Sequence, residues 1–257
     1  MMDFNERVIP GVTANFQFKE SLARYEFAKR CFGKNAKVID IGCGTGYGSA
    51  VLGEKYEVTA IDNNNEAIEY ANKHYSKKAR FLKANATTLP FEDSKFDAAC
   101  SFEVIEHLKD THKFMKEVHR VLRPGGKFIL STPNKFFHST GDKLKSPYHI
   151  KEYTAEELGH LLNKYFKTVG IKSQTKSKRA KTALKDFMAS QKARERFVVS
   201  DILRIRKIIP QAFKEKVWKC LGGLFGRKSQ ENLETRDFPI KPGNLSKAEY
   251  FVAVCKK

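Results

Sequence analysis

The chain has 257 residues, of which 41% are hydrophobic and 12% aromatic, which suits one α/β domain with an appendage rather than a disordered or fibrous protein. Its formal net charge of +19 is large for this size and points to acidic or phosphate-bearing partners. No apolar run approaches the length of a membrane span and MMDFNERVIPG has no apolar signal core, so we expect a cytoplasmic protein, with contact at a membrane surface left open.

The N-terminal segment, residues 1–35, is predicted to form a cap. Residues 5–11 are expected to be extended and to turn at Pro10 and Gly11, and a helix is predicted over Phe18–Cys31.

The next stretch, Lys37–Ser49, is predicted as a buried strand, a glycine turn and the start of a helix. Its sequence, KVIDIGCGTGYGS, places glycines directly after a short β-branched apolar run. Gly42, Gly44 and Gly46 have no Cβ, so the turn can adopt positive φ and let a ligand lie against the backbone. The dinucleotide pattern Gly-x-Gly-x-x-Gly fits neither register, because its third glycine would fall on a tyrosine or a serine.

Two carboxylates accompany this turn. Asp40 precedes the first glycine, where it would repel a pyrophosphate and attract a cation. Asp62 ends the next apolar strand, where a short acid suits a ribose diol. These acids, without a phosphate site, favour S-adenosylmethionine, whose sulfonium and amino groups are positive.

Strands and helices alternate from residue 36 to about 172, which predicts a mostly parallel sheet with right-handed crossovers. Strands are predicted near residues 36–41, 57–61, 79–82, 97–101, 127–132, 166–171 and 249–255. Helices are predicted over Glu66–Tyr75, over Thr111–Leu122 and after Thr154, which forms a capping box with Glu157. Ligands bind outside the carboxyl ends of strands in such sheets. The residues expected to converge there are Asp40, Asp62, Asn85, Phe102 and Glu103.

Four segments in this order resemble the class I S-adenosylmethionine-dependent methyltransferases of type 11/12, with a core similar to ubiquinone-pathway O-methyltransferases. They are the glycine stretch, FLKANATTLPF (81–91), FDAACSFEVIEHL (96–108) and LRPGGKFILSTPN (122–134). The resemblance implies a Rossmann-like α/β fold with a seven-stranded, mostly parallel sheet and an antiparallel last strand. It also implies that the N-terminal segment either closes over the cofactor or only covers the sheet. The helical insertion that we predict between strands six and seven is outside the resemblance and rests on the residues of that segment.

Carried over residue by residue, the resemblance implies a set of cofactor-binding positions. They are Asp40, Gly42, Cys43, Gly44, Gly46, Asp62, Asn63, Asn85, Ala86 and Phe102. Asn85 departs from the family, which usually has an acid there, although an amide carbonyl can still accept from an adenine amine.

Candidate catalytic residues are Glu103 and His107 in Glu-x-x-Glu-His, and His149 in YHIKEYTAEEL. With Glu106 they resemble the metal site of small-RNA 3′-end 2′-O-methyltransferases, in which a metal would lower the pKa of a substrate hydroxyl. The alternative is a loop motif of metal-free relatives, with the histidine structural or a general base. We predict no resident metal and keep Glu103, Glu106, His107 and His149 as candidate ligands. The five cysteines are widely spaced and give no zinc signature.

A basic helical insertion is predicted over residues 174–244, dividing the methyltransferase domain into 36–173 and 245–257. Residues 172–228 hold 17 basic and 4 acidic side chains. Apolar residues recur at helical spacing at Val198, Ile202, Ile205 and Ile209, and again at Phe213, Val217, Leu221 and Leu224. The two predicted amphipathic helices suit a substrate lid, an anionic membrane surface contacted by Phe213, Trp218 and Phe225, or nucleic acid.

The sequence thus predicts methyl transfer from S-adenosylmethionine, to oxygen of a small-molecule, sugar (glycan) or lipid-linked acceptor. Two alternatives stay open: a metal-dependent RNA 2′-O-methyltransferase, and a non-catalytic module that only binds the nucleoside.

Overall fold

The computed structural model describes residues 7–140, 143–144, 146–199 and 232–257. The second predicted amphipathic helix and most of the first lie outside these residues. The side chain of Val198, which opens the first stripe, is also outside the description.

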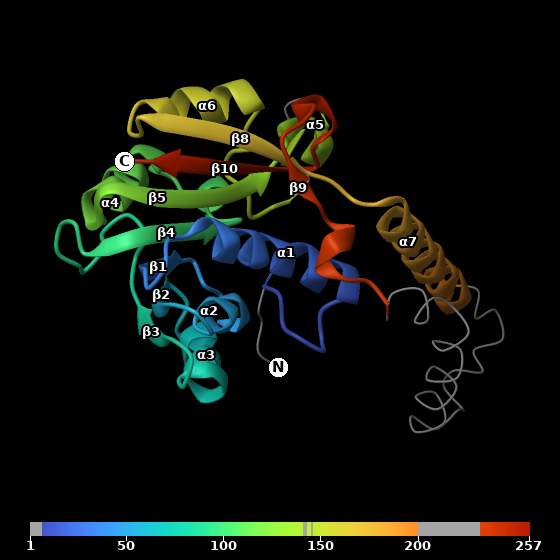
Figure 1. The fold of residues 1–257 in the computed structure, drawn as a ribbon. Helices are drawn as coiled ribbons and strands as arrows, with labels where there is room; N and C mark the ends of the chain where they lie inside the picture. The colour runs from blue at the N-terminus through green and yellow to red at the C-terminus, as the bar shows by residue number, and fades with distance from the viewer. Residues whose placement is uncertain (1–6, 141–142, 145, 200–231) are drawn as a thin grey trace.

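A single large sheet organises the described chain (Figure 1). Its strands are β1 (Lys37–Ile41), β2 (Glu57–Asp62), β3 (Arg80–Lys83), β4 (Phe96–Phe102), β5 (Leu122–Pro133), β8 (Thr168–Gln174), β9 (Ile240–Lys241) and β10 (Tyr250–Lys256). They lie in the order β3-β2-β1-β4-β5-β10-β8-β9. The first five are mutually parallel, and β10 runs antiparallel between β5 and β8, as predicted.

The predicted strand number was wrong by one, because the described residues form eight strands in this sheet. The additional strand is β9, a two-residue element that pairs with the end of β8 through Ser173 and Gln174. So short a pairing leaves no periodic pattern in the sequence. β9 also lies within residues 174–244, the range that we predicted as the insertion. The boundary at residue 244 stays a prediction.

Helices cover both faces of the sheet and create two cores. On one face α4 (Thr111–Val121) packs over β5 and α6 (Ala155–Asn163) packs over β8, with Phe114 and Leu162 fully buried. The other face carries α1 (Asn15–Cys31), α2 (Tyr47–Leu52) and α3 (Asn65–Tyr75). The predicted capping box at the start of α6 is confirmed, since Thr154 and Glu157 exchange both hydrogen bonds.

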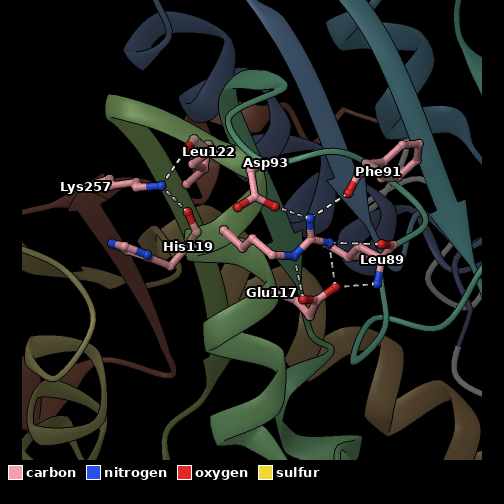
Figure 2. Close-up of polar contacts among 8 residues, drawn as sticks. Leu89, Phe91, Asp93, Glu117, His119, Leu122 and Lys257 are labelled. Carbon is pink, nitrogen blue, oxygen red and sulfur yellow. Dashed lines mark hydrogen bonds and ion pairs between the residues drawn. The ribbon is translucent and has the colours of Figure 1, made fainter.

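Arg120 on α4 fixes the connection between β3 and β4. Its guanidinium donates to the carbonyls of Leu89 (3.0 Å) and Phe91 (2.7 Å), and to the carboxylates of Asp93 and Glu117. Figure 2 shows these acceptors gathered around one point, with Lys257 donating nearby to two carbonyls of the same helix end. This network holds the segment that follows Asn85, and so helps to set the adjacent wall of the ligand site.

The short elements near the carboxyl ends of the strands are α5 (Lys135–His138), the β6 (Ser139–Thr140) and β7 (Lys143–Leu144) hairpin, and the 3-10 turns η1 (Ile105–His107), η3 (Thr235–Asp237) and η4 (Leu245–Lys247). In Figure 1 the arrowheads of β4 and β5 point toward the end of the molecule where α5 lies. Ligand sites of open α/β sheets form at this end.

The one described helix of the insertion, α7 (Lys178–Val199), follows β8 and packs against the start of α1. The rings of Phe16 and Phe187 lie 5.4 Å apart, over a small core that includes Ala180, Leu233 and Phe238. In the described part of the chain, no helix combines the length and apolar character needed to cross a membrane.

Candidate active site

A cavity of about 990 Å³ opens at the carboxyl ends of the parallel strands. One part, the glycine half, is formed by Gly42–Thr45, Asp62, Asn63, Ala84–Ala86 and Phe102. The other part, the histidine half, is formed by Glu20, Arg24, Glu103, Glu106, His107, His138, Pro147–His149, Glu152 and Tyr250. The volume lies at the upper end of the range for ligand pockets, so two reactants can occupy it together.

The glycine turn is anchored to the end of β2. The backbone N–H groups of Gly42 and Cys43 both donate to the carbonyl of Ile61, at 2.8 and 2.9 Å, and the Gly44 N–H donates to Asp62 Oδ2 at 2.9 Å. Gly44 has φ +53°, and a Cβ placed there would meet nothing nearer than the Arg7 side chain at 3.9 Å. The backbone at Gly44 therefore forms an open cradle for a ligand.

Asp62 is a buried acceptor in the glycine half, 7% exposed. Its Oδ1 accepts from the Asn64 N–H at 2.9 Å and from the Arg7 guanidinium at 3.3 Å. Sequence reasoning missed Arg7, which lies in an extended lead-in with no periodicity. The Thr45 hydroxyl donates to the carbonyl of Val8 at 2.6 Å, so this lead-in is fastened to the glycine turn itself.

Asp40 does not line the cavity, contrary to our expectation that it faces a cationic ligand. Its carboxylate is fully buried and accepts from Ser49 Oγ at 2.6 Å and from Cys100 Sγ at 3.5 Å. Burial raises its pKa from an ordinary 3.8 to about 6. In this structure Asp40 ties β1 to α2 and β4 beneath the glycine turn.

Gly46 also lies away from the cavity, and its φ of +84° serves the packing of the turn. Asn85 does line it, but the carbonyl oxygen that we expected to accept from a ligand amine already accepts from the Thr87 N–H and hydroxyl, both at 2.9 Å. The remaining predicted cofactor positions, Gly42, Cys43, Gly44, Asp62, Asn63, Ala86 and Phe102, all line the cavity.

Three of the four candidate ligands meet in the histidine half. Glu106, His107 and His149 each bring one ligand atom within 4.8 Å of the others. Glu106 is fully buried; its Oε2 accepts from Thr132 Oγ1 at 3.1 Å, whereas its Oε1 has no hydrogen-bond partner among the described residues. Burial raises the pKa of Glu106 well above its ordinary value, and the nearby Glu103 carboxylate raises it further. The two imidazole rings meet edge to face, with centroids 5.0 Å apart.

Glu103 lines the cavity but stands apart from this group, which departs from the predicted set of four. Its Oε1 accepts from Ser131 Oγ at 2.7 Å and lies 3.5 Å from the Arg24 guanidinium. Its backbone has φ +56°, a conformation that is costly for a non-glycine residue. Arg24 thus holds Glu103 toward α1, away from the two histidines.

The residues around Arg24 are a second set that sequence reasoning missed. Arg24 donates through Nε to Gln174 Oε1 at 2.7 Å and lies over the Tyr250 ring, 4.3 Å from its centroid. His138 approaches the same ring at 4.9 Å, and burial lowers its pKa. These residues come from α1, β8, β10 and α5, so no local motif unites them.

Comparison with known proteins finds similarity to methyltransferases. Residues 39–130 match the family model described as a methyltransferase domain. Over 161 residues the chain is 37% identical to a probable S-adenosylmethionine-dependent methyltransferase of Mycolicibacterium smegmatis, covering 61% of this chain and 62% of the relative. It is 36% identical over 122 residues to the chloroplastic tocopherol O-methyltransferase of Arabidopsis thaliana, covering 45% of this chain and 35% of that one.

The chain therefore spans less than two thirds of the length of these curated relatives. Among solved structures, an S-adenosylmethionine-dependent methyltransferase from Thermotoga maritima superposes with a TM-score of 0.61 at 18% identity, covering 95% of this chain and 91% of the other. That likeness is one of fold.

Proposed function

We propose that this chain is a class I S-adenosylmethionine-dependent methyltransferase that transfers a methyl group to an oxygen of a small-molecule, sugar or lipid-linked acceptor. One observation carries the proposal: a single cavity joins the glycine turn and Asp62 on one side to Glu106, His107 and His149 on the other.

The glycine half suits the cofactor of this family. Asp62 offers carboxylate oxygens of the kind that accept from a ribose diol, and the open backbone at Gly44 allows close approach. Phe102, whose ring packs edge to face on Tyr25 at 4.8 Å, gives this half an apolar wall. When bound, S-adenosylmethionine supplies a methyl group on a sulfonium, which leaves as a neutral thioether.

The histidine half supplies the groups that the acceptor requires. A hydroxyl is a weak nucleophile, so its oxygen must be held in line with the methyl group while a base takes its proton. His107 and His149 are the side chains that we propose for this proton, with Glu106 beside them. The tocopherol O-methyltransferase relative supports oxygen as the methylated atom.

We propose that the insertion acts as a lid on the acceptor side. Its described helix α7 packs on the start of α1, and α1 contributes Glu20 and Arg24 to the cavity. Four basic side chains, Lys178, Arg179, Lys181 and Lys185, are exposed on α7. A lid of this charge suits an acceptor that carries a phosphate or another acidic group.

A second candidate is metal-dependent methylation of a hydroxyl, including the 2′-hydroxyl of RNA. The convergence of Glu106, His107 and His149 favours it, because one carboxylate and two imidazoles form a donor set for a divalent cation. The buried Glu106 Oε1, which lacks a hydrogen-bond partner, would be satisfied by such an ion.

Calorimetric titration of S-adenosylmethionine into EDTA-treated protein, followed by titration of Mn²⁺, distinguishes the metal-independent function from the metal-dependent one. Cofactor binding without Mn²⁺ heat supports the metal-independent enzyme, and acceptor screens would then use glycan and lipid extracts. Mn²⁺ binding that is lost in His149→Ala but kept in His160→Ala, a change at an exposed histidine, supports the metal-dependent reading. No cofactor binding at all would refute the proposed function, and binding without turnover on any acceptor would favour a non-catalytic module.

A further inference from the structure

His149 has a buried carboxylate partner three residues along the chain. Its Nδ1 lies 2.7 Å from Glu152 Oε1, and the Glu152 side chain is completely buried while that of His149 is 11% exposed. No sequence motif had drawn attention to Glu152, although it lines the same cavity.

The partners of the two histidines determine where their ring hydrogens lie. An ionised carboxylate only accepts, so the hydrogen between His149 and Glu152 belongs to Nδ1, and Nε2 then carries the lone pair. His107 Nδ1 lies 3.0 Å from the carbonyl oxygen of Tyr148, which also only accepts. When neutral, each ring therefore keeps Nε2 as its accepting atom.

The loop that carries His149 is tied directly to the residues it faces. The N–H groups of Ile150 and Lys151 donate to the carbonyl of Glu106 at 2.7 and 3.2 Å, and the Lys135 N–H donates to the carbonyl of Tyr153 at 3.0 Å. The backbone thus fixes where the His149 ring sits, and Glu152 fixes how the ring is turned.

We propose that Glu152 is a positioning residue that holds His149 as the Nδ1–H tautomer, with Nε2 directed to the acceptor hydroxyl. This inference rests on the proposed function. In the transfer, the hydroxyl O–H bond breaks, its proton passes to His149 Nε2, and its oxygen forms the new bond to the methyl carbon as the thioether leaves. The Nε2–H tautomer would present a donor at that place and could not take the proton.

The test is nuclear magnetic resonance of the histidine side chains in ¹⁵N-histidine-labelled full-length protein at pH 8, where ordinary imidazoles are neutral. Long-range ¹H–¹⁵N correlations distinguish the two tautomers, and His149→Gln identifies the His149 signals. We expect His149 in the wild type to be the Nδ1–H tautomer. In Glu152→Gln, without the anionic acceptor, the Nε2–H tautomer should become populated; in Glu152→Asp, which keeps a carboxylate, the wild-type tautomer should persist at least in part.

The matched control is Glu156→Gln, which removes the carboxylate of an exposed pair, Glu156 with His160 at 3.6 Å, and should leave the His149 signals unchanged. An Nε2–H tautomer for His149 in the wild type overturns the proposal even if Glu152→Gln fails to fold, and so does an unaltered tautomer in a folded Glu152→Gln. Titration of S-adenosylmethionine into the same wild-type sample tests the proposed function separately, since the tautomer does not depend on that result.

Discussion

Replacing Gly46 by alanine should destabilise the protein more than the same change at Gly11, although both residues have nearly the same positive φ. Gly46 has φ +84° and Gly11 has φ +80°. A Cβ at Gly46 would lie 2.6 Å from the Ala71 Cβ and 2.8 Å from Phe81 Cε1, whereas a Cβ at Gly11 would meet no atom of the described residues within 4 Å. The pair therefore separates the cost of the backbone conformation from the cost of the clash.

The backbone cost for a non-glycine residue at positive φ is about 1–2 kcal/mol, and both variants incur it. Forcing a methyl group into the contact between α3 and β3 adds about 1–3 kcal/mol at Gly46, because Ala71 and Phe81 are buried and cannot move aside freely. Gly46→Ala should thus lose about 2–5 kcal/mol in total and Gly11→Ala about 1–2 kcal/mol.

Urea unfolding followed by circular dichroism measures both free energies. The difference between the two variants should also appear as a lower melting temperature for Gly46→Ala, by about 2–4 °C per kcal/mol for a chain of this size. Equal stability of Gly46→Ala and Gly11→Ala would refute the packing of the glycine turn on α3 and β3. Recovery of stability in Gly46→Ala by Phe81→Leu would support it.

Further predictions concern the ligand site, pH and the β3–β4 connection. Asp62→Ala should weaken binding of S-adenosylmethionine at least about tenfold, since about 1.4 kcal/mol is one decade and two acceptor oxygens are lost. Calorimetry with the exposed Glu156→Ala as control checks this, and unchanged affinity would contradict our placement of the cofactor. Burial raises the pKa of Asp40 to about 6, so between pH 3.8 and 6 the folded state keeps a proton that the unfolded state has released. The Asp40 contribution to stability is therefore fully present below pH 3.8 and is lost as the pH rises through 6, by on the order of 3 kcal/mol. Asp40→Asn should remove this pH dependence and be more stable than the wild type at pH 7.5 in urea unfolding. The prediction would be contradicted if the stability of the wild type relative to Asp40→Asn were greater at pH 7.5 than at pH 4.5. Arg120→Ala should cost about 2–3 kcal/mol because several acceptors lose a charged donor, whereas Lys116→Ala on the exposed side of the same helix should be neutral; equal melting temperatures would show that the network contributes little.

Much of the fold and half of the site could be predicted because the information is local. The apolar run before Gly42, the capping box at Thr154 and the alternation of strands and helices depend on residues within a few positions of one another. The same holds for Gly42–Gly44 and Asp62, which end adjacent parallel strands and so must meet at one edge of the sheet.

Only the tertiary structure decided which side chains form the histidine half and which partners the individual charged groups have. Whether Glu103 joins His107 and His149 depends on Arg24, which is 79 positions earlier and is itself oriented by Gln174 and Tyr250. Asp40 lies outside the cavity, where it accepts hydrogen bonds from Ser49 and from Cys100, which is 60 positions later in the sequence. The short β9 likewise exists because the chain returns beside β8. The sequence by itself determined which residues could form strands, turns and an open glycine cradle, because backbone preferences and apolar periodicity act over short range. Only folding determined which carboxylate meets which cation and which histidine nitrogen meets a hydrogen-bond acceptor, because hydrogen bonds and ion pairs depend on atoms being within a few ångströms in space.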